Sequence, residues 1–156
     1  IMADPGKIKT PPRTIQPNGF TPIVDSQPTK VEFDYSVHKS FYSQEQFELS
    51  EINRQALERL VELADEYEFD VYIANSPIFH ELKVDPDFQS YFTNVQDLLI
   101  NLDVRSPYIH YVLCETPSYQ KEVMTNVDHL TLEGALSFTD TLAKNIASNQ
   151  DCVTSR

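Results

Sequence analysis

The sequence predicts a mixed α/β fold built around a parallel sheet, and two features of its apolar pattern carry that prediction. Short continuous apolar runs at 71–74 and 108–114 have the length and composition of buried strands. Amphipathic stretches at 43–67, 86–102 and 132–147 have helical spacing and alternate with those runs. This order is typical of parallel strands joined by helical crossovers. We therefore expect neighbouring parallel strands with helices on both faces, a three-layer α/β/α arrangement.

Composition changes near the start of the first helix. Six of the ten prolines lie within residues 1–30, where they remove backbone donors and block regular structure. The predicted organisation is an extended proline-rich arm at 1–42, the α/β unit at 43–149 and a polar tail at 150–156. So long a structureless stretch is uncommon in a compact domain, which favours an excised piece of a larger protein or an arm that wraps a partner.

Capping signals mark the first two helices. The first is expected to begin with a capping box of Ser43 and Gln46, and the second with Asp85 as N-cap and Pro86 in the first turn. The apolar stripe of the first helix is expected to be Leu49, Ile52, Ala56, Leu60, Leu63 and Tyr67. That of the second is expected to be Phe88, Tyr91, Phe92, Val95, Leu98, Leu99 and Leu102.

Charge and cysteine content exclude several classes of function. A net charge of −12 argues against binding to nucleic acid or to an anionic membrane surface, and is typical of a soluble protein. No apolar run approaches the roughly 18 residues of a membrane span, so no membrane insertion is expected. Cys114 is expected to pack as a small hydrophobe and Cys152 to lie in the polar tail. Neither has metal-ligand spacing, and we expect no metal and no cofactor.

A polar turn leads into the last amphipathic helix. The turn is Asn126-Val127-Asp128-His129, and Thr131 is a plausible N-cap for the helix that follows. Gly134 has no Cβ, so a neighbouring segment could approach the helix closely there. A helix that packs against the rest of the fold would hold His129 at the edge of a rigid element. The alternative is that His129 is a helix-entry residue bonded to the backbone.

The stretch from His129 to Ala135 resembles the last motif block of the SGNH/GDSL hydrolase superfamily. In that block an Asp-x-x-His pair is followed by Leu, a Gly-Ala step and a helix, and here Asn126 stands at the Asp position with Asp128 beside the histidine. The resemblance covers about residues 45–148. It implies an SGNH-like α/β/α fold with flavodoxin-like layering, incomplete in this chain. It also implies a GDSL-like esterase, hydrolase or O-acyltransferase site in which His129, Asn126 and Asp128 are catalytic.

The crevice of such a site can be located from the strand ends. Ligands of open α/β sheets bind beyond the carboxyl ends of the strands, where Asn75 and Ser76 follow the first strand. We expect both residues near His129, with the Asn75 amide as a donor to a developing oxyanion. A turn role before Pro77 is the alternative for Ser76.

The nucleophile of the family is absent from the sequence. Its serine lies in a Gly-Asp-Ser turn, whereas the nearest match here is Val24-Asp25-Ser26 in the proline-rich arm. We therefore expect the chain to represent the C-terminal portion of the domain, with the serine upstream or missing, and to be inactive alone.

Two classes of function follow. The first is an acyl-ester hydrolase or O-acyltransferase, whose substrate would be a small ester or an acylated carbohydrate. The second is a non-catalytic α/β module that binds a protein partner, or the remainder of its own domain, through residues 1–42 and its acidic surface. The compartment stays open, and the resemblance favours association of the parent protein with the cell envelope. The remaining histidines are expected to be a surface residue (His38), a loop residue (His80) and a strand-face residue (His110).

Overall fold

The structure is a computed structural model that describes residues 39, 42, 48–148 and 152–153. Its elements in chain order are α2 (Glu51–Tyr67), β1 (Val71–Ala74), β2 (Ile78–Phe79), α3 (His80–Lys83), α4 (Pro86–Arg105), β3 (Ile109–Val112), β4 (Ser118–Tyr119), the short 3-10 helix η1 (Lys121–Val123) and α5 (Leu132–Ala147). Helices and short parallel strands are mixed, which confirms the general α/β class. Nearly all of the expected arm and most of the expected tail lie outside the described residues.

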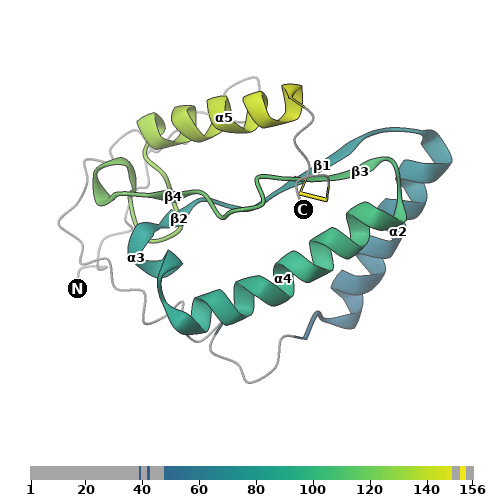
Figure 1. Ribbon diagram of the computed structural model, residues 1–156, viewed down its shortest axis with the longest axis horizontal. Coiled ribbons are helices and arrows are strands. Elements are labelled where there is room, and N and C mark those ends of the chain that lie inside the picture. The colour runs from purple at the N-terminus through teal and green to yellow at the C-terminus, as the bar shows by residue number, and fades with distance from the viewer. Residues whose placement is uncertain (1–38, 40–41, 43–47, 149–151, 154–156) are drawn as a thin grey trace, which may run out of the picture.

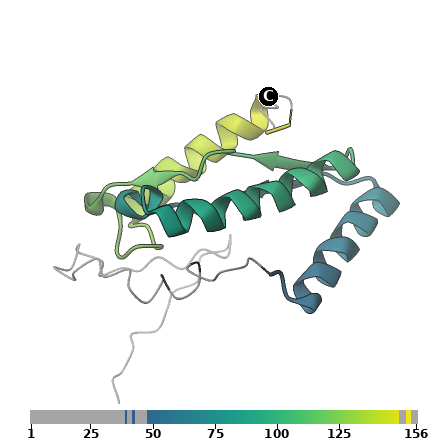
Figure 2. The same cartoon turned by 60° about the horizontal axis from the view of Figure 1, so that its bottom comes forward.

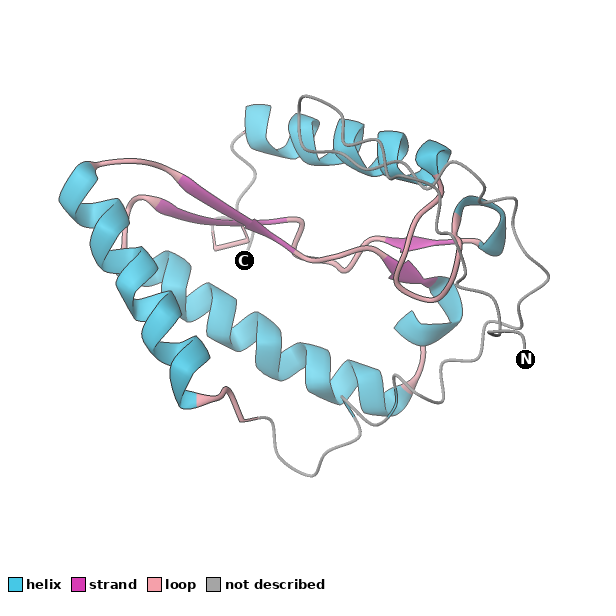
Figure 3. Cartoon of the chain, turned by 180° about the vertical axis from the view of Figure 1, so that it is seen from behind, coloured by secondary structure: helices cyan, strands magenta, loops and turns pink. Residues whose placement is uncertain are grey.

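Two chain segments run side by side and form the strands. β1 pairs in parallel with β3, from Val71 opposite Ile109 to Ala74 opposite Val112, as the sequence predicts. The same two segments meet again as the parallel pair β2–β4, which the sequence did not predict (Figure 3). β3 ends before the expected boundary because Leu113 has a φ of 57°, which an extended strand does not allow.

The start of α2 differs from the prediction. Ser50 is the N-cap and accepts a hydrogen bond from the N–H of Asn53 at 3.3 Å, so the helix begins at Glu51. Residues 48–50 are described and are not helical. The proposed capping residues Ser43 and Gln46 lie outside the described residues.

The buried face of α2 also differs from the predicted stripe. Val61 and Ala64 are buried and Leu57 packs against them, whereas Ile52 and Tyr67 are 79% and 65% exposed. The helix therefore carries apolar residues on two faces, and the structure buries the one that the sequence analysis did not select.

α4 begins where the sequence predicts and continues to Arg105. Asp85 caps it by accepting from the N–H groups of Asp87 (3.0 Å) and Phe88 (3.3 Å). Burial by itself raises the pKa of Asp85, but the Lys39 ammonium at 3.1 Å and these two N–H groups outweigh it and hold the pKa below its usual value. At the other end, the Arg105 guanidinium bonds the Glu58 carboxylate of α2 and joins the two helices.

α2 and α4 pack on the same face of the β1–β3 pair. Their shared core consists of Val61, Ala64, Leu102 and Ile109, with Leu57, Val71, Ile73, Leu99 and Tyr108 around it. α5 lies on the other side of the strands, and a second view shows the same order (Figures 1 and 2). Gly134 is the one buried residue of α5, so this helix is only lightly packed against the rest of the described structure. None of the helices described here is both long enough and apolar enough to cross a bilayer.

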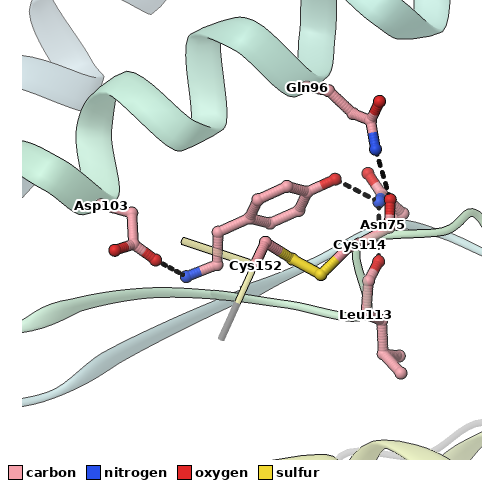
Figure 4. The surroundings of a disulfide bond; sticks show 7 residues. Asn75, Gln96, Asp103, Leu113, Cys114 and Cys152 are labelled. Carbon is pink, nitrogen blue, oxygen red and sulfur yellow. Dashed lines mark hydrogen bonds between the residues drawn. A yellow bond between two sulfur atoms is a disulfide. The ribbon is translucent and has the colours of Figure 1, made fainter. Parts of the chain in front are cut away.

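A disulfide joins the segment after α5 to the end of β3. Cys114, just after β3, is bonded to Cys152 (Figure 4). The N–H of Cys152 donates to the carbonyl of Tyr111 at 2.9 Å. The sequence leaves the redox state of the two cysteines open, and the structure shows them bonded to each other, with Cys152 only 3% exposed. The pairing depends on the chain returning to β3 after α5, and no spacing in the sequence indicates that return.

Candidate functional site

The start of α5 is fixed against η1 by one carbonyl. The Val123 carbonyl accepts from the Thr131 N–H at 2.9 Å and from the Thr131 hydroxyl at 3.1 Å. The same hydroxyl accepts from the N–H of Gly134 at 3.2 Å, as expected for an N-cap. A Cβ on Gly134 would lie 2.4 Å from the Val123 oxygen. The close approach expected at this glycine is therefore present, and the partner is backbone.

The turn that carries His129 rests on a small apolar cluster. Phe79, Met124 and Val127 are buried together, with Tyr119 and Leu130 packed against them. The N–H of Phe79 donates to the Val127 carbonyl at 2.9 Å, and Met124 and Leu130 form an antiparallel bridge. The turn is thus held by the hydrogen bond from β2 and by the bridge between Met124 and Leu130 at its two ends.

Asn126 organises the turn from within. Its side-chain oxygen accepts from the N–H of Asp128 at 3.2 Å and from the N–H of His129 at 2.8 Å. The same oxygen lies 3.0 Å from Nδ1 of His129, and a carboxylate oxygen of Asp128 lies 2.7 Å from that nitrogen. The expected contact between Asn126 and the imidazole is present, and Asp128 joins it.

These contacts determine the tautomer of His129. Both neighbours of Nδ1 are acceptors, since the Asn126 oxygen is already fixed by two backbone N–H donors. In the neutral imidazole Nδ1 therefore carries the proton and the lone pair is on Nε2. Nε2 has no hydrogen-bond partner among the described residues, and the side chain is 60% exposed. The neutral imidazole therefore presents an acceptor nitrogen to solvent just before α5.

The Asn75 side chain forms hydrogen bonds with Tyr111 and Leu113 and not with the His129 turn. It is buried, and its side-chain nitrogen donates to the Tyr111 hydroxyl at 2.6 Å and to the Leu113 carbonyl at 3.0 Å (Figure 4). Both amide protons are thus used inside the protein to tie β1 to the end of β3. This arrangement gives no support to the oxyanion role expected for Asn75.

Ser76 is exposed and makes no hydrogen bond with the described residues. The structure brings His129, Asn126 and Asp128 together, but no hydrogen bond joins them to Asn75 or Ser76.

Two other histidines provide a comparison. His110 lies in β3, as expected, with Nε2 at 2.9 Å from the Asp70 carboxylate and its ring stacked on Tyr72. His80 is the first residue of α3 rather than a loop residue, and its Nδ1 is buried without a hydrogen-bond partner in the described structure. Within the described ranges, no three His, Cys, Asp or Glu side chains are grouped to hold a metal ion.

Sequence reasoning missed Tyr111 and the Val123 carbonyl, which anchor Asn75 and α5. Tyr111 lies within the apolar run 108–114, which predicts a buried strand, but no signal in the sequence names its partner. A groove of about 290 Å³ between α4 and the segment after β3 was also missed; Phe92, Gln96 and Thr116 are among the residues that line it. None of its lining residues belongs to the His129 turn.

Comparison with other proteins adds no family to this picture. No protein-family model matches the chain, and no curated protein or solved structure matches it either.

Proposed function

We propose that the chain is the histidine-bearing, C-terminal portion of an SGNH-like acyl-ester hydrolase or O-acyltransferase domain. One observation carries the proposal: Nδ1 of His129 is held between the oxygens of Asn126 (3.0 Å) and Asp128 (2.7 Å), which leaves Nε2 free. A histidine that serves as general base in acyl transfer needs this arrangement, with one nitrogen oriented by an acceptor and the other facing the nucleophile.

In the proposed reaction, Nε2 takes the proton from a serine hydroxyl as the oxygen attacks the ester carbonyl. The same nitrogen then gives that proton to the leaving alcohol. Asp128 offers negative charge to the imidazolium, and the neutral Asn126 holds the ring orientation. Because Asp128 is 43% exposed, solvent weakens its charge interaction. The serine would come from a part of the domain outside the described residues.

The finer fold proposal is a three-layer α/β/α arrangement of flavodoxin-like layering. Its support is the parallel β1–β3 pair, with α2 and α4 packed on one face and α5 on the other side. A helical crossover between parallel strands is the unit from which such folds are built.

The disulfide bears on the proposed compartment. Cys114 and Cys152 are bonded and Cys152 is 3% exposed. Buried structural disulfides form and persist in oxidising compartments. This supports our proposal that the parent protein works at the cell envelope with its α/β unit outside the reducing cytosol.

The test is an ester-hydrolysis assay on the natural full-length polypeptide. We expect His129→Ala to lower the turnover of p-nitrophenyl acetate by about 10²–10⁴-fold, the usual contribution of a general acid–base residue. His110→Ala is the matched control, because His110 also pairs with an aspartate but lies on a strand. Equal activity in the two variants would remove the proposal.

A second candidate is the non-catalytic binding module. The observation that favours it is an apolar pair on α5 beside the His129 turn, because Leu132 and Leu136 are 54% and 64% exposed. Exposed apolar side chains that lie together mark interaction sites. Full-length protein that lacks esterase activity, and that loses binding of a co-purifying protein in Leu132→Ser/Leu136→Ser, would favour this candidate.

A further inference from the structure

The two outer edges of the β1–β3 pair are unlike each other. In a strand, successive residues direct their N–H and C=O groups to opposite sides. Those of Ile109 and Tyr111 point away from β1, and the described residues occupy this edge. The N–H of Ile109 donates to the Ser106 carbonyl at 3.2 Å and the N–H of Tyr111 to the Asp103 carboxylate at 2.6 Å. The Tyr111 carbonyl accepts from the N–H of Cys152. The disulfide to Cys114 holds Cys152 in place (Figure 4).

The outer edge of β1 has no such protection. Val71 faces β3, since its N–H donates to the Tyr108 carbonyl at 2.8 Å. Tyr72 and Ala74 therefore direct their backbone groups to the other side, where none of the described residues forms a hydrogen bond with them. The Tyr72 side chain is 42% exposed as well. An unpaired strand edge is a template for a further strand.

Topology indicates which strand fits there. α4 carries the chain from β1 to β3, and α2 carries it into β1, with both helices on the same face of the pair. A crossover between parallel strands is right-handed in about 98% of cases. When two crossovers have the same hand and lie over the same face of a sheet, both move the chain across the sheet in the same direction. A strand that precedes α2 would therefore lie on the side of β1 opposite to β3, which is the unprotected edge.

The surface of α2 supports the same position. Its buried face, around Leu57, Val61 and Ala64, covers β1 and β3. A second apolar face, which includes Ile52 and Tyr67, remains exposed. A helix that also covered a further strand beside β1 would need apolar residues on this second face. In the described structure Ile52 and Tyr67 are not covered.

We propose that the outer edge of β1 is the docking site for a parallel β-strand contributed by the polypeptide N-terminal to residue 48. The strand would pair with the backbone of Tyr72 and Ala74 and place apolar side chains under the second face of α2. This inference rests on strand pairing and crossover hand, and it holds whether or not His129 is catalytic.

Amide hydrogen exchange on the natural full-length polypeptide tests the proposal. We expect the amides of Tyr72 and Ala74 to exchange at least about 100-fold more slowly than unprotected amides. The same protection is expected for Val71 and Ile73, which pair with β3 and serve as the internal reference. NMR contacts from Tyr72 to residues N-terminal to residue 48, in parallel register, are also expected. Free exchange at Tyr72 and Ala74 would overturn the proposal. Protection that depends on protein concentration would overturn it too, since a second copy would then occupy the edge.

A pair of variants gives an independent measurement. Ala74→Pro removes the outward N–H, whereas Ala74→Ser keeps it at similar size. Proline is tolerated at a solvated strand edge but not where the N–H is paired. We expect Ala74→Pro to unfold at a lower urea concentration than Ala74→Ser. Equal midpoints for the two variants would contradict the docked strand.

Discussion

Gly134→Ala probes the contact that positions the His129 turn. On an ordinary helix, Gly to Ala stabilises by about 1 kcal/mol through helix propensity. At this position the new methyl would lie 2.4 Å from the Val123 carbonyl oxygen, which is backbone and is already held by Thr131. The helix start and η1 must move apart, and overpacking of this kind costs about 1–3 kcal/mol.

We therefore expect Gly134→Ala to lower the free energy of unfolding by up to about 2 kcal/mol once the gain in propensity is subtracted. Urea denaturation followed by circular dichroism measures this change. Ser137→Ala, at an exposed position of α5, is the control and should stay within about 0.5 kcal/mol of the wild type. Stabilisation by Gly134→Ala would refute the close contact between α5 and η1.

Four further predictions concern stability and activity. Asp85→Ala should cost about 0.5–2 kcal/mol through loss of the α4 cap. Because the folded pKa of Asp85 is lowered, the advantage of the wild type over Asp85→Asn should be present near neutral pH and disappear as the pH falls below about 4; an advantage unchanged at pH 2 would contradict this. Cys152→Ser should lower stability by about 2–4 kcal/mol in urea denaturation, and an equal effect of reductant on both proteins would contradict the bond. Residues 1–156 alone should hydrolyse p-nitrophenyl acetate poorly or not at all, and robust turnover that disappears in Ser26→Ala or Ser76→Ala would show this wrong.

Local chemistry made much of the fold predictable from the sequence. Asp85-Pro86 is a strong helix start, and short apolar runs separated by a helix imply parallel pairing. The face that α2 buries could not be predicted in the same way, because two sets of its apolar residues have helical spacing. Only tertiary packing selects between them.

The same distinction between local contacts and tertiary packing applies to the candidate site. The contact between Asn126 and His129 spans three residues and follows from a local turn. The roles of Asn75 and the two cysteines depend on partners 36 and 38 residues away, which periodicity cannot identify. Local geometry was therefore visible in the sequence, and pairing between distant segments was not.

The tautomer of His129 tests the account most directly. Long-range ¹H–¹⁵N NMR of the imidazole at a pH where it is neutral reports which ring nitrogen carries the proton. We expect the proton of His129 on Nδ1, beside Asn126 and Asp128. His110, whose Nε2 faces Asp70, should show the opposite tautomer in the same spectrum. A proton on Nε2 of His129 would contradict the account, because that nitrogen could not then accept a proton from a nucleophile.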